Sequence, residues 1–201
     1  MMDTAAENHS EADLLLLKDL LIRTYSSHAV FARRVNVYTQ RLRIVSFAGF
    51  LVPATVGSLI LADKQWATSL LVTVGSIFLV VQFAFSLWAV FAKWDDKLSR
   101  ALSLQIQQLR IFKEAENIKA LSKSLSPEEL RARINMCRDL ESGLAQEEHS
   151  QEVSDYEKVY GFRSALYHLR SECPICKKIP SDSPRRMKGE CKACSFFPLF
   201  F

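Results

Sequence analysis

The sequence has few of the residues from which enzyme active sites are commonly assembled. Only 6 of its 201 residues are glycine and only 4 are histidine. They form no phosphate-binding glycine loop, no nucleophile elbow and no pair of histidines on one helix face. The sequence also has no internal repeat and no run of alternating strand-forming residues. These absences predict an all-helical protein that is not an enzyme.

Charge is missing from two neighbouring stretches, 44–62 and 66–92, which are separated only by residues 63–65. A helix rises about 1.5 Å per residue, so the first stretch matches the roughly 30 Å hydrocarbon core of a bilayer and the second exceeds it. A buried hairpin in a soluble domain is the alternative, but uncharged runs in core helices are usually shorter. We therefore predict a two-span transmembrane hairpin over residues 41–93.

Basic residues flank this hairpin, whereas its connecting loop has only Lys64, beside Asp63. Positively charged flanks stay in the cytoplasm, and the loop is too short to oppose that bias. Both termini are therefore expected to be cytoplasmic. The flanking residues are Arg33, Arg34, Arg41 and Arg43 before the hairpin, and Lys93, Lys97, Arg100 and Arg110 after it.

An amphipathic helix is expected before the hairpin. Ser10 can cap its first turn, and no glycine or proline interrupts the chain before Arg41. Apolar side chains recur along it at steps of three and four residues, so it has an apolar stripe. Helices of the same chain or of a neighbouring subunit must cover that stripe.

Further helices are expected after the hairpin. The first continues past the second span and ends between Leu121 and Ser126. There Ser126 followed by Pro127 and Glu129 provides a cap, a first-turn proline and a capping-box acid, which predict the start of another helix. An acidic linker at 146–155 then precedes a final helix.

Three cysteine and histidine side chains in these helices are interpreted as packing residues. His28 and His168 lie on apolar helical stripes, where a packed role is more common than a chemical one. Cys137 lies between apolar neighbours and is expected to be a small buried side chain.

The predicted fold class is an all-α membrane protein. It consists of a two-span transmembrane helical hairpin, cytosolic helices and a small C-terminal zinc-knuckle module. The predicted domains are the N-terminal amphipathic helix (1–40), the hairpin (41–93), a cytosolic helical region (94–170) and the four-cysteine module (171–201).

Four of the five cysteines form two C-x-x-C pairs, and fourteen residues separate the pairs. The short spacing lets both thiolates of a pair face one metal, and two pairs complete a tetrahedron of sulfur, for which zinc is the default metal. Such a zinc would be structural because four thiolates leave no position for water. Two disulfides or a redox-active pair are alternatives, which a reducing cytosol and the lack of a strand–helix–strand pattern disfavour. The proposed ligands are Cys173, Cys176, Cys191 and Cys194.

The C-terminal segment is basic. From Arg170 onward, basic residues outnumber acidic ones by four, which equals the formal net charge of +4 for the whole chain. That charge is too small to indicate nucleic-acid binding by itself. Five basic residues between the cysteine pairs either contact phosphate or simply form a solvated loop. They are Lys177, Lys178, Arg185, Arg186 and Lys188.

Small and polar residues recur along one side of the predicted second span. Thr68, Gly75 and Gln82 follow one another at intervals of seven, and Ser86 lies nearby on the same side. Small residues let helices approach closely, so a helix–helix interface is one interpretation. An amide at mid-bilayer depth also needs a partner or water, so a pore lining is the other.

The order of these segments resembles that of the SLATT membrane effectors of bacterial conflict systems. The resemblance covers roughly residues 10–170 and rests on the N-terminal helix, the arginine-flanked hairpin with a minimal loop, and the helical extension. It implies a multi-pass protein of the bacterial inner membrane that assembles as a homo-oligomer. It also implies an upstream sensor of phage, such as a nucleotide-signal synthase or a reverse transcriptase. The four-cysteine module is not part of that common core.

Two functions follow from these observations. The favoured one is an oligomeric membrane effector that forms a pore or disrupts the inner membrane in anti-phage defence, triggered through its cytosolic helices. The alternative is a membrane-anchored adaptor whose zinc module binds a protein or nucleic-acid partner. A signalling nucleotidyltransferase or reverse transcriptase encoded next door would favour the effector.

Overall fold

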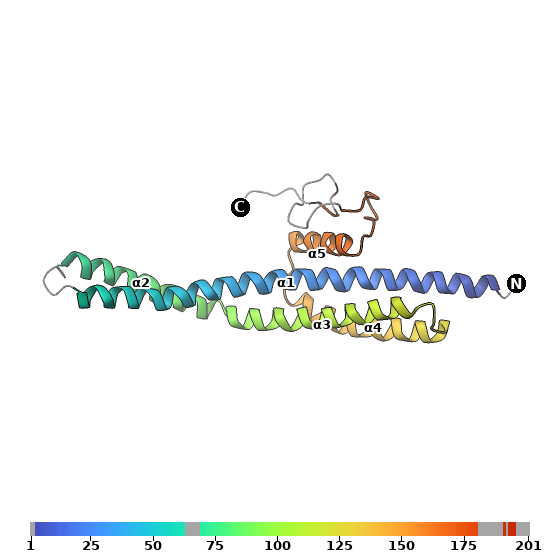
Figure 1. Cartoon of the computed structure of the whole chain (residues 1–201), viewed down its shortest axis with the longest axis horizontal. Helices are drawn as coiled ribbons and strands as arrows, with labels where there is room; N and C mark the ends of the chain where they lie inside the picture. The colour runs from blue at the N-terminus through green and yellow to red at the C-terminus, as the bar shows by residue number, and fades with distance from the viewer. Residues whose placement is uncertain (1–2, 63–68, 181–190, 192, 196–201) are drawn as a thin grey trace. The chain divides into compact units, whose positions relative to one another are not determined.

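The computed structural model describes residues 3–62, 69–180, 191 and 193–195, and this part of the chain is mostly helical (Figure 1). Contacts group the chain into two units. Unit 1 combines Met1–Arg33 with Leu102–Phe201, and unit 2 is Arg34–Ala101. The helices are α1 (Asp3–Ala62), α2 (Ser69–Phe91), α3 (Trp94–Leu121), α4 (Pro127–His149) and α5 (Asp155–His168).

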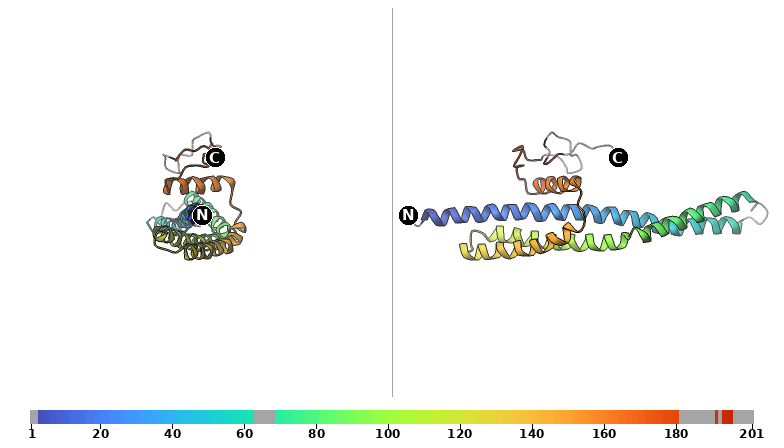
Figure 2. Two further views of the ribbon diagram at one scale, coloured as in Figure 1. Left: turned by 90° about the vertical axis from the view of Figure 1, so that its right-hand side faces the viewer. Right: turned by 180° about the vertical axis from the view of Figure 1, so that it is seen from behind.

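In unit 1, α3 and α4 lie together on one side of α1, and α5 lies on the opposite side (Figures 1 and 2). The apolar stripe of α1 is thus covered by helices of its own chain. Burying one large aliphatic side chain in this way contributes about 1.5–3 kcal/mol. The core between α1, α3 and α4 contains Leu17, Leu20, Leu21, Ile111, Phe112, Ala115, Ile118, Leu130, Ile134 and Cys137.

Local capping residues determine where α4 and α5 begin. The Oγ atom of Ser126 accepts a hydrogen bond from the backbone N–H of Glu129 at 3.2 Å, and Pro127 is the first residue of α4, as predicted. At α5, Ser154 and Glu157 form a complete capping box, so Ser154, at the end of the predicted linker, is the cap of this helix. The prediction was also wrong at the N-terminus, because α1 already begins at Asp3 rather than after Ser10.

A partly buried polar contact joins α1, α3 and α4. The carboxylate of Glu148 accepts hydrogen bonds from Ser27 Oγ at 3.1 Å and from Gln108 Nε2 at 2.6 Å. Burial raises the pKa of the Glu148 carboxyl above its ordinary value. Nearby, the Nδ1–H group of His28 donates to the carbonyl oxygen of Gln105 at 3.2 Å, so His28 has the packed role expected of it.

In unit 2, α1 and α2 approach each other where Gly49 meets Gln82. A Cβ atom on Gly49 would lie 3.3 Å from the Nε2 atom of Gln82, so the glycine makes room for this amide. At the other end of the unit, the Arg41 guanidinium lies 5.7 Å from the ring centroid of Trp94. Large apolar side chains of α2 are exposed, including Val80, Phe83, Trp88 and Phe91.

The structure contradicts the predicted transmembrane hairpin. Among the residues that it describes, no helix has both the length and the apolar character needed to cross a membrane. The prediction counted uncharged residues through 44–62 and 66–92. The fold class is therefore corrected to a mostly helical protein with a four-cysteine cluster, and the multi-pass inner-membrane localisation is not supported.

The residues considered for a pore are placed as follows. Gln82 is half-buried beside Gly49, and Gly75 is buried on the same helix. Thr68 and the side chain of Ser86 lie outside the described residues. Because no helix among the described residues could span a membrane, the pore interpretation is not supported there, and the contact between Gly49 and Gln82 joins α1 and α2.

Candidate metal centre

The metal site begins directly after α5. The chain leaves the helix at Leu169 and turns at Arg170, whose φ of 50° lies in the left-handed region. A short loop follows, in which the backbone N–H of Cys173 donates to the carbonyl oxygen of Lys178 at 3.0 Å, and that of Lys177 donates to Cys173 at 2.8 Å. In the second C-x-x-C segment, the N–H of Ser195 donates to the carbonyl oxygen of Cys191 at 2.8 Å. These bonds curl each segment around its own cysteine pair.

The four sulfur atoms have the geometry of a tetrahedral zinc site. They all lie within 4.8 Å of one another, and two distances are 3.9 Å for Cys173 to Cys191 and 3.7 Å for Cys176 to Cys194. Zinc–sulfur bonds of about 2.3 Å place the corners of a tetrahedron about 3.8 Å apart. All four cysteines are free thiols in the structure, so the disulfide alternative does not describe it. The cluster fits zinc, as the sequence predicted.

The environment of the sulfur atoms differs from one side of the cluster to the other. Cys173 and Cys194 are buried, whereas Cys176 and Cys191 are partly exposed. Hydrogen bonds from the backbone N–H groups of Cys194 and Ala193 lower the pKa of the Cys191 thiol to about 7. Burial instead raises the pKa of the Cys194 thiol. Because metal binding requires thiolates, the N–H groups around Cys191 favour the ligand form of that residue.

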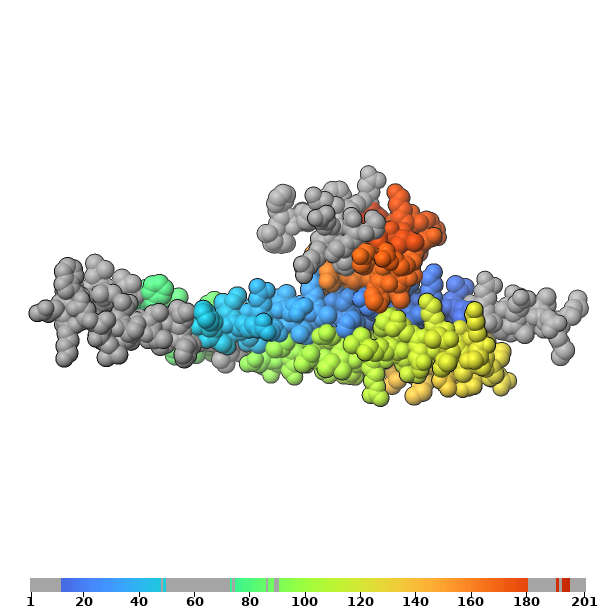
Figure 3. All heavy atoms as spheres, in the orientation of Figure 1, coloured from blue at the N-terminus to red at the C-terminus, as the bar shows by residue number. Residues whose placement is uncertain are grey.

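The buried side of the cluster packs on the helical body. Cys173 and Cys194 form a small core with Leu166 of α5, and Ile22 of α1 and Phe162 of α5 pack against it. These side chains join the metal module to α5 and α1 through apolar contacts. Figure 3 shows the side chains of α5 (orange) resting on those of α1 (blue).

Arg163 is the polar residue that connects α5 to the cluster. Its side chain is only 5% exposed, and its Nη1 atom donates to the carbonyl oxygen of Cys194 at 2.8 Å. Among the described residues it makes no ion pair, and its Nε atom has no hydrogen-bond partner. A guanidinium is always charged, and a buried charge is costly unless a counter-charge lies nearby. Four thiolates around one zinc ion carry two negative charges in excess, so the loaded site would supply that counter-charge.

Aromatic stacking and a close helix contact fix α5 on α1. The rings of Tyr25 and His168 stack with centroids 4.2 Å apart and an interplanar angle of 9°. The Arg33 guanidinium lies 4.7 Å from the ring centroid of Tyr156. A Cβ atom on Gly161 would lie 2.6 Å from the Ser26 carbonyl oxygen, so only glycine allows the helices to approach this closely.

The basic residues proposed for phosphate contact are only partly described. Lys177 and Lys178 are exposed beside Cys176, and Lys177 has a φ of 57°. Arg185, Arg186 and Lys188 lie outside the described residues.

Sequence reasoning missed Arg163 and Gly161 as residues of this site. The available signal was the position of an arginine and a glycine within the apolar pattern of the final helix, where buried residues are usually large and apolar. That signal does not reveal which partner each residue meets.

The chain matches a known family of proteins. A family model described as "Mobilome CxxCx(11)CxxC protein" matches residues 16–197 of the chain. No curated protein and no solved structure matches. The family description has eleven residues between the cysteine pairs, whereas this chain has fourteen. The four cysteines that converge in the structure are those of the motif in the description.

Proposed function

Because the chain belongs to the mobilome CxxCx(11)CxxC family, we propose that it is a helical effector of a mobile-element or conflict system, controlled through its zinc module. In this proposal Cys173, Cys176, Cys191 and Cys194 hold a structural zinc ion. The ion completes the fold of the C-terminal module, and the module in turn holds α5 against α1. The protein carries out no catalysis itself.

One observation carries this proposal: α5 contacts both the cysteine cluster and α1. Arg163 and Leu166 face the cluster, whereas Tyr156, Gly161 and His168 meet α1. A change in the module would therefore alter the α5 contacts on the same helix that forms the core with α3 and α4. Zinc itself supplies only coordination and charge, because four thiolates fill its shell.

The similarity to SLATT effectors supports a finer version of the proposal. It rests on the long first helix, the helical hairpin and the helical extension that follows it. By that similarity the trigger is an associated sensor that detects phage, such as a nucleotide-signal synthase or a reverse transcriptase. The zinc module would then be the part of this chain that the sensor or its product engages.

A phage-protection assay tests the proposed function. Cells that carry the native locus should lose protection when Cys173→Ser removes one zinc ligand. Cys137→Ala is the matched control, because Cys137 is also a buried free thiol but lies in the core with α1 and α3, away from the cluster. Protection should persist in the control. Full protection by the Cys173→Ser variant at normal protein level would overturn the proposal.

An adaptor that binds nucleic acid is the second candidate. The exposed Lys177 and Lys178 beside the cluster favour it, since a basic loop next to a zinc knuckle suits phosphate. In that case the Lys177→Glu and Lys178→Glu double variant should retain zinc but lose salt-dependent binding to a single-stranded oligonucleotide. Equal binding by the wild type and the double variant would exclude this candidate.

A further inference from the structure

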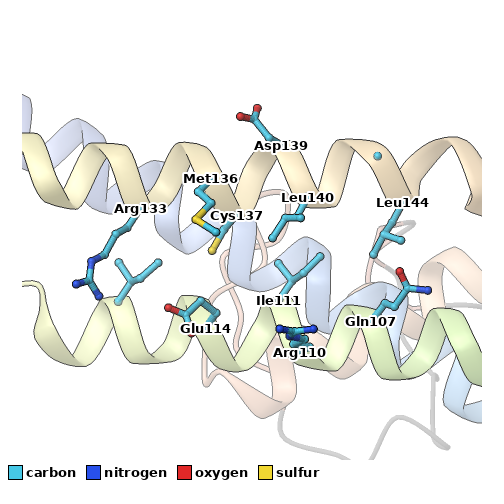
Figure 4. Close-up of a pocket in the computed structure, with 12 residues that line it drawn as sticks. Gln107, Arg110, Ile111, Glu114, Arg133, Met136, Cys137, Asp139, Leu140 and Leu144 are labelled. Atoms are coloured by element: carbon cyan, nitrogen blue, oxygen red, sulfur yellow. The ribbon is translucent and has the colours of Figure 1, made fainter.

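A groove runs between α3 and α4 in unit 1 (Figure 4). It has a volume of about 720 Å³. Its floor is formed by Ile111, Ile118 and Cys137, which also belong to the core with α1. The groove is therefore the outer side of the three-helix core, at a position where a further helix would complete the packing.

Large apolar side chains stand exposed at this groove. Met136 is 66% exposed and Leu140 is 52% exposed, and both line it from α4. Apolar side chains gathered in this way on a polar helix pair mark an interaction surface.

Charged residues of both signs surround the apolar side chains. Arg110 and Glu114 lie on α3, and Arg133 and Asp139 lie on α4. Arg133 pairs with Glu129 on its own helix at 3.0 Å. The structure describes no ion pair for Arg110, Glu114 or Asp139 within the chain. Each helix thus offers one positive and one negative charge at the groove.

The order of these charges makes the groove complementary to itself. Along the helices, Arg110 lies close to the level of Asp139 and Leu140, and Glu114 lies between the levels of Arg133 and Leu140 (Figure 4). A two-fold axis parallel to the helices places α3 of one copy over α4 of the other. Arg110 then faces Asp139 of the second copy, and Glu114 faces Arg133.

We propose that the groove between α3 and α4 is the interface of a parallel two-fold dimer formed by two copies of this chain. Met136 and Leu140 of each copy pack against α3 of the other copy and are removed from water. Opposite charges meet on both sides of this apolar centre, as a self-complementary interface requires. The dimer goes beyond the proposed function and does not depend on zinc.

Sedimentation velocity of the full chain tests this assignment. The wild type should show a concentration-dependent monomer–dimer equilibrium. Met136→Lys should raise the dissociation constant at least about tenfold, because a charge enters the apolar centre of the interface. Leu15→Glu is the matched control, since Leu15 is 63% exposed on α1 and does not line the groove. The control should leave the equilibrium unchanged.

A charge exchange tests the two-fold arrangement. Arg110→Glu should weaken the dimer about fivefold or more, because two negative residues then face each other, and the added substitution Asp139→Arg should restore it. Arg138→Glu changes the same charge on α4 outside the groove and should have no effect. Circular dichroism checks that each variant is folded. A monomeric wild type, an effect of Met136→Lys no larger than that of its control, or a failure of the exchange to restore the dimer would overturn the proposal.

Discussion

At the scale of single residues, the buried Arg163 and the half-buried Glu148 differ in how their charges are accommodated. Arg163 stays charged, and the described part of the chain offers it one carbonyl oxygen and no carboxylate. The thiolates of a loaded metal centre would supply a counter-charge for this buried guanidinium. Glu148 is a half-buried acid that accepts hydrogen bonds from two neutral donors, and partial burial raises the pKa of its carboxyl. The environment of Arg163 is therefore linked to the metal site, and the charge of Glu148 is linked to pH.

Replacing Glu148 by glutamine should stabilise the protein at neutral pH. The folded chain holds the Glu148 proton more tightly than the unfolded chain does, because the pKa of the carboxyl is raised on folding. The stability that the protonated Glu148 contributes is fully present below the ordinary glutamate pKa. It is lost as the pH rises through the pKa that Glu148 has in the folded chain. Glutamine keeps a carbonyl oxygen for Gln108 and an amide for Ser27, without a charge to bury. Above the pKa of Glu148 in the folded chain, we expect Glu148→Gln to raise the free energy of unfolding by about 1 kcal/mol.

Urea unfolding over a series of pH values measures this effect. The wild type and Glu148→Gln should converge in acid and diverge as the pH rises. Glu147→Gln is the control, because Glu147 is the exposed neighbour on the same helix turn. A stability difference between the wild type and Glu148→Gln that does not vary with pH would contradict this prediction.

At the scale of secondary-structure elements, the position of α5 on α1 is set by one close contact. The helices approach so closely at Gly161 and Ser26 that an added methyl group would overlap a backbone carbonyl oxygen, which cannot move as a flexible side chain can. The stacked rings of Tyr25 and His168 then align the end of α5. The element that bears Arg163 is therefore held in one place.

Gly161→Ala should destabilise this contact, whereas Gly143→Ala should not. Alanine at 161 forces α5 away from α1, at a cost of about 1–3 kcal/mol. Gly143 lies within α4 with nothing near its added Cβ, so alanine there should stabilise the helix by about 0.5–1 kcal/mol. Thermal unfolding of both variants gives the comparison. A Gly161→Ala variant as stable as Gly143→Ala would show that the two helices do not pack in this way.

At the scale of the whole molecule, local features were predictable from the sequence and distant contacts were not. The start of α4 follows from Ser126, Pro127 and Glu129, because capping acts within one turn. The zinc ligands follow from their spacing. The contact between Arg163 and Cys194 joins residues 31 apart, and no periodicity indicates it.

The predicted transmembrane hairpin was wrong because it too depends on how distant parts of the chain pack. The prediction of a membrane span depends only on the length of the two uncharged runs in the sequence. In the described part of the chain, no helix meets the requirement for a crossing. The neighbouring glycine and glutamine in the same segments instead mark a contact between α1 and α2, which depends on how the chain folds back.

The central claim is that zinc in the four-cysteine module holds α5 on α1. Hydrogen exchange of the reduced, zinc-loaded protein before and after a chelator is added tests it most directly. Amides of α5 should lose protection when zinc leaves, whereas those of α4 in the core should keep it. Arg163→Met should show reduced α5 protection even with zinc present. Purified protein without about one zinc per chain, or α5 protection that chelation leaves unchanged, would contradict the account.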